Sequence, residues 1–229
     1  MTATPGSDAP TATAERGAGY VRRFDRTERA VHWIHAVAFF GMLATGLALY
    51  LPALSGAIGR RDLVRDLHLI VAIGWMVALL AVCLGGNRHS LRRALAEIEV
   101  FDRDDLRWLR GRRAPQGRFN AGQKLHAVLQ TAFAVLFTVS GVLLWLGERN
   151  TTFRLSGTVV LHDALTFLAL LFVVGHLYLA LLHPSTRPAL RGIVRGTVRR
   201  DWAAEHHARW RPEEVDAPVE RDEIAGRRR

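Results

Sequence analysis

The sequence predicts an all-α membrane protein built as a bundle of four transmembrane helices. Hydrophobic residues make up 49% of the 229 residues, yet the mean hydropathy is only +0.08. The two values agree because long apolar runs alternate with arginine-rich stretches, as is typical of a membrane protein with polar loops. The apolar runs also carry several histidines, which are rare inside membrane spans.

Four apolar stretches are each long enough to cross a bilayer, which takes about 20 helical residues. A segment in lipid has to satisfy its own backbone hydrogen bonds, so each stretch is predicted to be a helix. The predicted spans are residues 30–52, 64–86, 122–147 and 157–183.

The spans lie within one predicted domain, residues 21–200, between two tails. Residues 1–20 are rich in Ala, Thr, Pro and Gly and lack the apolar core of a signal peptide, so we expect a disordered N-terminal tail. We expect residues 201–229, which contain six arginines, to form a C-terminal tail in the cytoplasm.

The distribution of Lys and Arg predicts the orientation. The chain has five before the first span, ten in the second loop (87–124) and eleven after the fourth span. The first and third loops have only three and two. Because basic residues favour the cytoplasmic side, we expect a multi-pass protein of the bacterial plasma membrane with both termini in the cytoplasm.

The second loop contains apolar residues at roughly helical spacing in its segment 98–113. This segment is either an amphipathic helix on the cytoplasmic surface or a solvated, charged loop.

Charge and cysteine content exclude several classes of protein. The net charge is +10, but the basic residues are dispersed over the loops beside the spans without a nucleic-acid-binding module, so we expect contact with membrane lipid and no nucleic acid. The single cysteine, Cys83, rules out a disulfide within the chain, a CxxCH haem attachment and a cysteine cluster. Histidine is then the main candidate for holding a metal.

Seven of the ten histidines lie in the spans or at their ends, and ionisable residues there are functional candidates. They are His32, His35, His68, His126, His162, His176 and His183.

Depth in the membrane pairs four of these histidines. The predicted topology places His32 and His176 near the cytoplasmic face, and His68 and His162 near the outer face. Since 14 residues separate His162 from His176, the two lie about 21 Å apart and on one side of the fourth helix. Facing histidines on two helices are what the axial ligation of a b-type haem requires, so the pattern predicts two haems. Hydrogen-bonded histidines between helices are the alternative.

Several motifs resemble the gamma subunit of membrane-bound formate dehydrogenases, a di-haem cytochrome b, over about residues 20 to 210. In chain order they are RFDRTERAVHWI, RDLHLIVAIG, GRFNAGQK, LHDAL, GHLYLALL and WAAEHHARW.

The resemblance implies the pairing that depth predicts, with His32 and His176 on the cytoplasmic-side haem and His68 and His162 on the outer-side haem.

The resemblance also implies a quinone site in GRFNAGQK. There Asn120 and the backbone around Gly122 would bind a quinone carbonyl close to His176, supported by Gln123 and Lys124. From the residues alone, the favoured interpretation of Asn120 is a plain helix N-cap with flanking interfacial charges. The roles of His35, His126 and His183 stay open. Asp163, next to His162, is an ionisable residue within an otherwise apolar span.

The function implied by the resemblance is that of an electron-transfer subunit without a catalytic centre of its own. It would take electrons from an iron–sulfur beta subunit, whose partner alpha subunit holds molybdenum or tungsten, and deliver them to quinone. The same spans and histidines would suit a cytochrome b of a nickel–iron hydrogenase or a sulfur-compound reductase, or a stand-alone quinone-linked cytochrome of the b561 type. A haem-free membrane scaffold is the alternative from another class.

Overall fold

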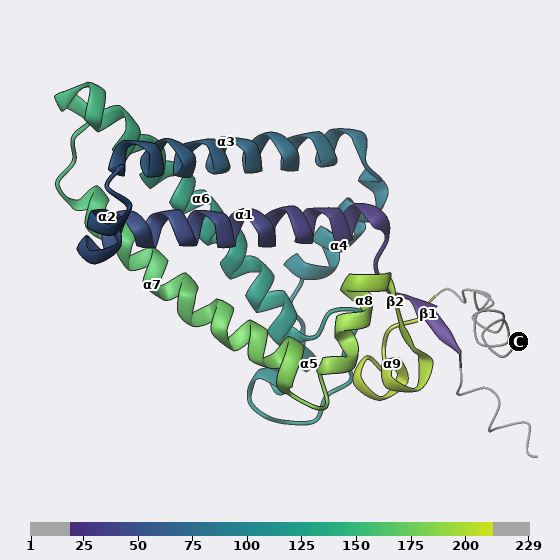
Figure 1. Ribbon diagram of the computed structural model, residues 1–229. Coiled ribbons are helices and arrows are strands. Elements are labelled where there is room, and N and C mark those ends of the chain that lie inside the picture. Colours follow the sequence, from purple (N-terminus) through teal and green to yellow (C-terminus); the bar gives the residue numbers. More distant parts are fainter. Residues whose placement is uncertain (1–18, 213–229) are drawn as a thin grey trace, which may run out of the picture.

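The computed structural model describes residues 19–212 and is dominated by four long helices that run side by side in alternating directions (Figure 1). Their lengths and apolar composition are sufficient to cross a membrane, which confirms the prediction of four helices able to span it. These helices are α1 (Arg26–Tyr50), α3 (Arg61–Gly85), α6 (Ala121–Arg149) and α7 (Gly157–Leu177), which a π-helical turn, η3 (Tyr178–Leu182), extends.

The four helices form two hairpins. Helix α1 packs along α3 and helix α6 packs along α7, whereas contacts between the two hairpins are sparse within residues 19–212. The first hairpin turns through α2 (Pro52–Ile58) and the second through the short helix η2 (Thr151–Phe153). An aromatic cluster around Phe133 joins the hairpins, because Phe39 of α1 packs against residues of α6 and α7 there. The hairpins are therefore two preformed units with limited direct contact.

Polar caps explain where α1 and α6 begin. At each start the N-cap side chain accepts the backbone N–H three residues on, and that third residue accepts the N-cap N–H in return. Asp25 and Glu28 make this exchange for α1, and Asn120 and Gln123 make it for α6. Asn120 is thus a helix cap, as the residues alone predict.

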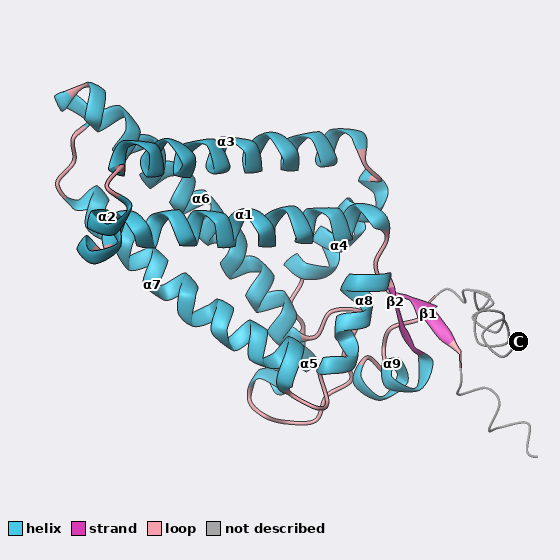
Figure 2. Ribbon diagram, in the orientation of Figure 1, coloured by secondary structure: helices cyan, strands magenta, loops and turns pink. Residues whose placement is uncertain are grey.

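One end of the bundle carries a small module made from both ends of the described chain (Figure 2). The antiparallel strands β1 (Tyr20–Arg22) and β2 (Thr197–Arg199) pair there. Their buried Val21 and Val198 pack with Trp202. The module also contains η4 (Arg187–Ala189), α8 (Leu190–Arg195) and α9 (Arg200–His206). We call residues 19–24 and 187–210 the terminal module, its side of the bundle the module end, and the opposite side the α2 end.

The terminal module adds to the predicted organisation. A two-stranded sheet accompanies the helices, and the folded part continues past residue 200 into α9, where the sequence predicted only a tail. The rest of the predicted tails, residues 1–18 and 213–229, lies outside the described residues.

The second loop folds into two helices, α4 (Arg88–Glu99) and α5 (Arg103–Leu109). Of the two interpretations of residues 98–113, a helix or a loop, neither describes the whole segment, because α4 ends at Glu99 and α5 covers only Arg103–Leu109. The reason is local, because Asp102 accepts the N–H groups of Asp104 and Asp105 and so starts a new helix.

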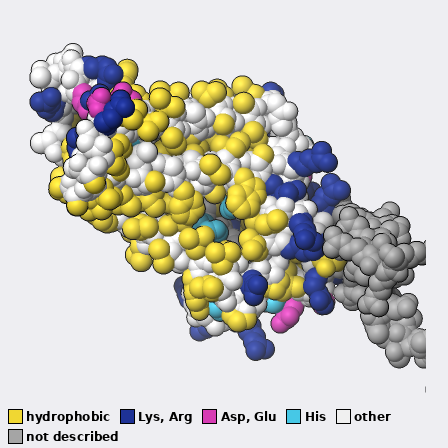
Figure 3. All heavy atoms as spheres, in the orientation of Figure 1, with side chains coloured by type: hydrophobic (Ala, Val, Ile, Leu, Met, Phe, Trp, Pro, Cys, Tyr) yellow, Lys and Arg dark blue, Asp and Glu magenta, His cyan; other side chains and the backbone are white. Residues whose placement is uncertain are grey.

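The surface shows a broad apolar zone between two charged ends (Figure 3). Many large apolar side chains of the four long helices are exposed, among them Val37, Ile70, Val77 and Leu171 at 61% or more. In water such an apolar surface would drive aggregation, whereas in a bilayer it faces lipid.

A buried ion pair anchors the start of α6 to α5. The Lys124 ammonium lies 2.7 Å from the Asp105 carboxylate and also donates to the Val100 carbonyl at 2.9 Å. The Asp105 side chain is fully buried and that of Lys124 is 9% exposed. Removing one partner of such a pair leaves an uncompensated charge in a poorly solvated site.

We therefore expect Lys124→Met to lower the free energy of unfolding by about 3–5 kcal/mol. Thermal unfolding of the detergent-solubilised protein measures this change. The matched control is Arg107→Met, which removes a pair with Asp104 in which the Arg107 side chain is 61% exposed, and which should cost about 1 kcal/mol or less. Equal losses in the two variants would contradict the stabilising role of the buried pair.

Candidate functional site

Two pairs of histidines face each other between the hairpins at opposite ends of the bundle. At the module end, the ring centres of His32 on α1 and His176 on α7 lie 6.3 Å apart. At the α2 end, those of His68 on α3 and His162 on α7 lie 6.4 Å apart. Helix α7 contributes one ring to each pair. We call these the module-end pair and the α2-end pair.

The spacing of both pairs fits two imidazoles on opposite sides of one iron. A metal–imidazole bond is about 2 Å long, so the two ring centres of such a pair lie about 6 Å apart. Residues 19–212 contain no group of three or more His, Cys, Asp or Glu side chains arranged to hold a metal ion. The geometry thus suits a cofactor that brings its own equatorial ligands, as haem does.

The α2-end pair is held by hydroxyl groups of the neighbouring helices. Thr45 Oγ1 on α1 lies 2.8 Å from His68 Nδ1, and Ser140 Oγ on α6 lies 2.9 Å from His162 Nδ1. Each ring therefore has its Nδ1 engaged and its Nε2 free to bind a metal.

A glycine follows each of these hydroxyl residues and leaves room beside the ring. A Cβ at Gly46 would lie 3.6 Å from Cε1 of His68, and one at Gly141 would lie 3.8 Å from Cε1 of His162. A methyl group would be tolerated, but a larger side chain would crowd the Cε1 side of the ring. The space needed beside a ligating imidazole is therefore built into α1 and α6.

The module-end pair has different neighbours. The ring of His126, on α6, stacks on His176 with centres 4.8 Å apart and planes within 3°. The ring of His35 lies 5.8 Å from that of Trp75. His183 follows the π-helical turn, contacts Ser185 and Tyr178 and takes no part in either pair. His176 thus has His32 on one helix and His126 on another within reach.

The predicted quinone residues lie at the start of α6, on the module side of these rings. Asn120 Oδ1 accepts the Gln123 N–H at 2.9 Å, and Gln123 Oε1 accepts the Asn120 N–H at 3.1 Å. Gly122 packs under Trp108 of α5, since a Cβ there would come within 3.1 Å of the indole. His126, one turn further along α6, connects this segment to His176 through the stacked rings.

A buried arginine pair supports this segment from below. Arg23 donates to the Arg118 carbonyl at 3.0 Å and to Gln123 Oε1 at 3.1 Å. Arg118 in turn binds Glu28 at 2.7 Å and Glu97 at 2.6 Å. Burial, together with the positive charge of Arg118, lowers the pKa of Arg23 to about 9, so Arg23 stays positive at neutral pH.

A histidine of the terminal module fastens the turn that precedes Asn120. His207 is 1% exposed, and its Nδ1 lies 2.6 Å from the Gly117 carbonyl oxygen. Burial and the charge of Arg23 lower the pKa of His207 to about 3. The ring is therefore neutral, and its Nδ1–H donates to Gly117. Arg23 and His207 lie in the motifs RFDRTERAVHWI and WAAEHHARW, but their roles could not be predicted from the sequence.

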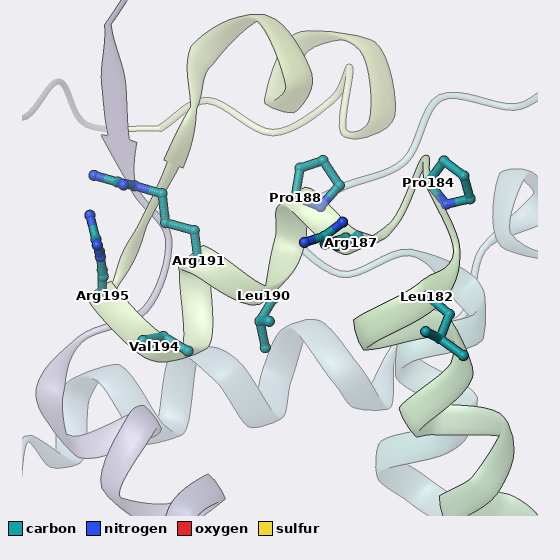
Figure 4. Close-up of a pocket in the computed structure, with 8 residues that line it drawn as sticks. All are labelled: Leu182, Pro184, Arg187, Pro188, Leu190, Arg191, Val194 and Arg195. Atoms are coloured by element: carbon teal, nitrogen blue, oxygen red, sulfur yellow. The ribbon is translucent and has the colours of Figure 1, made fainter.

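A pocket of about 580 Å³ opens beside α8, lined by arginines and apolar residues from η3 to α8 (Figure 4). Arg191 and Arg195 point toward β1, while Leu190 and Val194 point to the other side of the helix. Arg191 stacks on the Tyr20 ring, 4.0 Å from its centre. None of the histidines lines this pocket, so it is separate from the paired rings.

The family of the chain follows from a comparison with known proteins. The sequence profile of the prokaryotic cytochrome b561 family matches residues 23–196. The chain belongs to this family. The match covers all four long helices, so this cytochrome is an integral membrane protein of a family that binds b-type haem.

Curated relatives of this cytochrome match over most of their length. The formate dehydrogenase cytochrome b556 subunit of Haemophilus influenzae is 27% identical over 85% of this chain and 83% of its own. In Escherichia coli K12, the cytochrome b556(Fdn) subunit of the nitrate-inducible formate dehydrogenase is 25% identical over 87% of this chain and 94% of its own. The cytochrome b556(fdo) subunit of the same organism is 28% identical over 82% and 90%.

The His207 contact makes the stability of this cytochrome depend on pH. Below pH 6.5, the usual pKa of histidine, His207 is protonated in the unfolded chain, whereas in the folded protein its pKa of about 3 keeps the ring neutral. Stability is therefore lost as the pH falls from 6.5 toward 3. We expect His207→Gln, which keeps an N–H donor but cannot titrate, to flatten the loss measured by thermal unfolding between about pH 7 and about pH 4.

The control for this prediction is His206→Gln, which changes the neighbouring ring but leaves the contact between His207 and Gly117. This variant should keep the pH dependence of the unmodified protein. An unchanged pH dependence in His207→Gln would exclude His207 as the titrating group.

Proposed function

We propose that this protein is the di-haem cytochrome b subunit of a membrane-bound formate dehydrogenase and delivers electrons to quinone. The observation that carries the proposal is the presence of two histidine pairs with nearly equal ring spacing, 6.3 and 6.4 Å, at opposite ends of an apolar bundle. Two such pairs stacked across a membrane are suited to carrying charge through it.

The two pairs would hold two b-type haems, His32 with His176 and His68 with His162. When bound, each haem supplies a one-electron redox centre, and the protein sets its position, ligands and surroundings. Two histidines on one haem would leave its iron no open coordination position, which would disfavour binding of oxygen or substrate there. The stacked His126 ring belongs to the surroundings of the module-end pair and is not needed as a ligand.

The distribution of basic residues supports a cytoplasmic position for the module end. The second loop (87–124) and residues 187–212 contain 17 of the 31 Lys and Arg residues, and basic side chains of the described residues gather at the module end (Figure 3). The α2-end pair is then on the outer side, where an iron–sulfur subunit would donate electrons. Quinone would be reduced at the module end, with protons from the cytoplasm.

The start of α6 would bind the quinone. Asn120 Oδ1 is occupied by the helix cap, but the Asn120 side-chain N–H₂ group has no partner within the described part of the chain, so it can donate to a quinone carbonyl. In the first turn of α6 the N–H groups of Ala121 and Gln123 donate to Gln116 Oε1 and Asn120 Oδ1. The Gly122 N–H would therefore be the backbone donor to the quinone, and the helix dipole there favours negative charge. Gln123 holds Asn120 in place and is itself held by Arg23.

The names of the relatives support the choice of partner. Each of the three described above is a cytochrome b556 subunit of a formate dehydrogenase. An alpha subunit with molybdenum or tungsten and an iron–sulfur beta subunit would complete the complex.

The direct test is a reduced-minus-oxidised optical spectrum of the detergent-purified chain, with extracted haem counted per chain. The proposal expects two b-type haems. A colourless protein, after expression with sufficient haem, would refute it in favour of a haem-free scaffold. Co-purification of hydrogenase or sulfur-compound reductase subunits, in place of those of a formate dehydrogenase, would reassign the partner and leave the cytochrome role intact.

We expect His176→Ala to lose one of the two haems and the ability to reduce quinone. The α2-end pair does not include His176, so the second haem should remain. Haem counting and a quinone-reduction assay on the same preparation measure the two effects. His183→Ala, which removes a histidine outside both pairs, is the matched control and should keep two haems. Retention of both haems in His176→Ala would refute the assigned pairing.

We expect Asn120→Ser to weaken binding of a quinone analogue by about 2- to 10-fold, the effect of one lost hydrogen bond. Serine still caps the helix but has no amide group to donate. Haem content should be unchanged, since Asn120 belongs to neither pair. Analogue affinity can be measured by inhibition of quinol oxidation. An affinity equal to that of the unmodified protein would rule out Asn120 as a quinone ligand.

A further inference from the structure

Two hydroxyl residues stand out among those within the long helices. Thr131, Thr138 and Thr166 each donate to a backbone carbonyl four residues earlier, as helix hydroxyls commonly do. Thr45 and Ser140 make the same backbone contact, and in addition each meets a histidine ring nitrogen on the partner helix of its hairpin.

The single proton of each hydroxyl determines the direction of these bonds. Thr45 Oγ1 donates to the Gly41 carbonyl at 2.8 Å, and Ser140 Oγ donates to the Leu136 carbonyl at 2.7 Å. Each oxygen can then only accept from the imidazole. Both rings therefore carry their proton on Nδ1 and leave the lone pair of Nε2 free.

The two hairpins repeat this arrangement. In the first, Thr45 and Gly46 of α1 hold the ring from α3; in the second, Ser140 and Gly141 of α6 hold the ring from α7. In each hairpin the hydroxyl engages Nδ1, and the glycine that follows it leaves room beside Cε1 of the same ring. Two unrelated stretches of sequence thus meet the same requirement in the same way.

The module-end pair lacks such support. No hydrogen bond reaches a ring nitrogen of His32 or His176 from any residue between 19 and 212, although both rings have aromatic neighbours. A hydrogen bond accepted from Nδ1–H makes an imidazole a more basic and more electron-donating ligand. Only the α2-end pair has this property.

We propose that Thr45 and Ser140 are positioning residues that hold His68 and His162 as Nδ1–H tautomers and give the haem at the α2 end the lower reduction potential. This inference rests on the proposed function, because it needs a haem between these rings. A more donating ligand set stabilises the oxidised iron and lowers the potential. Electrons would then move downhill from the α2 end toward the quinone end.

The experiment compares Thr45→Val, Ser140→Ala and the double variant with the unmodified protein. Potentiometric titration of the purified cytochrome, followed optically, gives the potential of each haem, and extraction gives the haem count. We expect the lower of the two potentials to rise in each single variant and to rise further in the double variant, while the higher one stays in place. Haem affinity at that site should fall by about 10-fold or more.

Matched variants separate this role from a general effect on packing. Thr138→Val removes a hydroxyl of α6 that has the same backbone bond but no histidine, and should leave both potentials and the haem count unchanged. Thr45→Ser and Ser140→Thr keep the hydroxyl while changing its bulk, and should retain the lower potential.

The outcomes distinguish this inference from the proposed function. An unmodified protein without two haems would refute the proposed function itself. Two haems in the unmodified protein, with both potentials unchanged in Thr45→Val and Ser140→Ala, would overturn the role of the hydroxyls alone. If the double variant loses haem, the two single variants still decide, and failure of Thr45→Ser and Ser140→Thr to retain the lower potential would also overturn it.

Discussion

The structure depends on the cost of placing imidazole rings among apolar side chains. A ring nitrogen without a partner in such surroundings is expensive, and six histidines lie in the four long helices. The α2-end pair meets part of this cost with hydroxyl groups of α1 and α6. The two rings of each pair face one another across the two hairpins. Direct contacts between the hairpins are sparse among the described residues, and the haems proposed above would occupy the space between them.

Much of this arrangement could be predicted from the sequence because membrane proteins obey strong constraints. The length of the apolar runs determined the spans, and the fixed rise of a helix placed His162 and His176 at two depths. Asn120 was recognisable as a cap from its position before an apolar run. The pairing of His32 with His176 needed only the topology, and the structure places these rings together.

Other features depend on contacts that no local pattern encodes. Thr45 and Ser140 look like ordinary helix hydroxyls in the sequence, since their histidine partners lie 23 and 22 residues away. His207 and Gly117 are 90 residues apart, so the neutral buried ring could not be foreseen. The stacking of His126 on His176 likewise depends on how α6 and α7 cross.

The pairing of β1 with β2 bears on how the protein is made. Residues 20–22 bond to residues 197–199, so this ladder can form only after all four spans have left the ribosome. Long-range pairing of this kind is slow because nearly the whole chain has to be brought together first. The hydrogen bond from His207 to the Gly117 carbonyl also forms only after the fourth span has been synthesised. The segment around Asn120 therefore reaches its final shape at the end of biogenesis, and a truncated chain inserted in the membrane would lack a finished site.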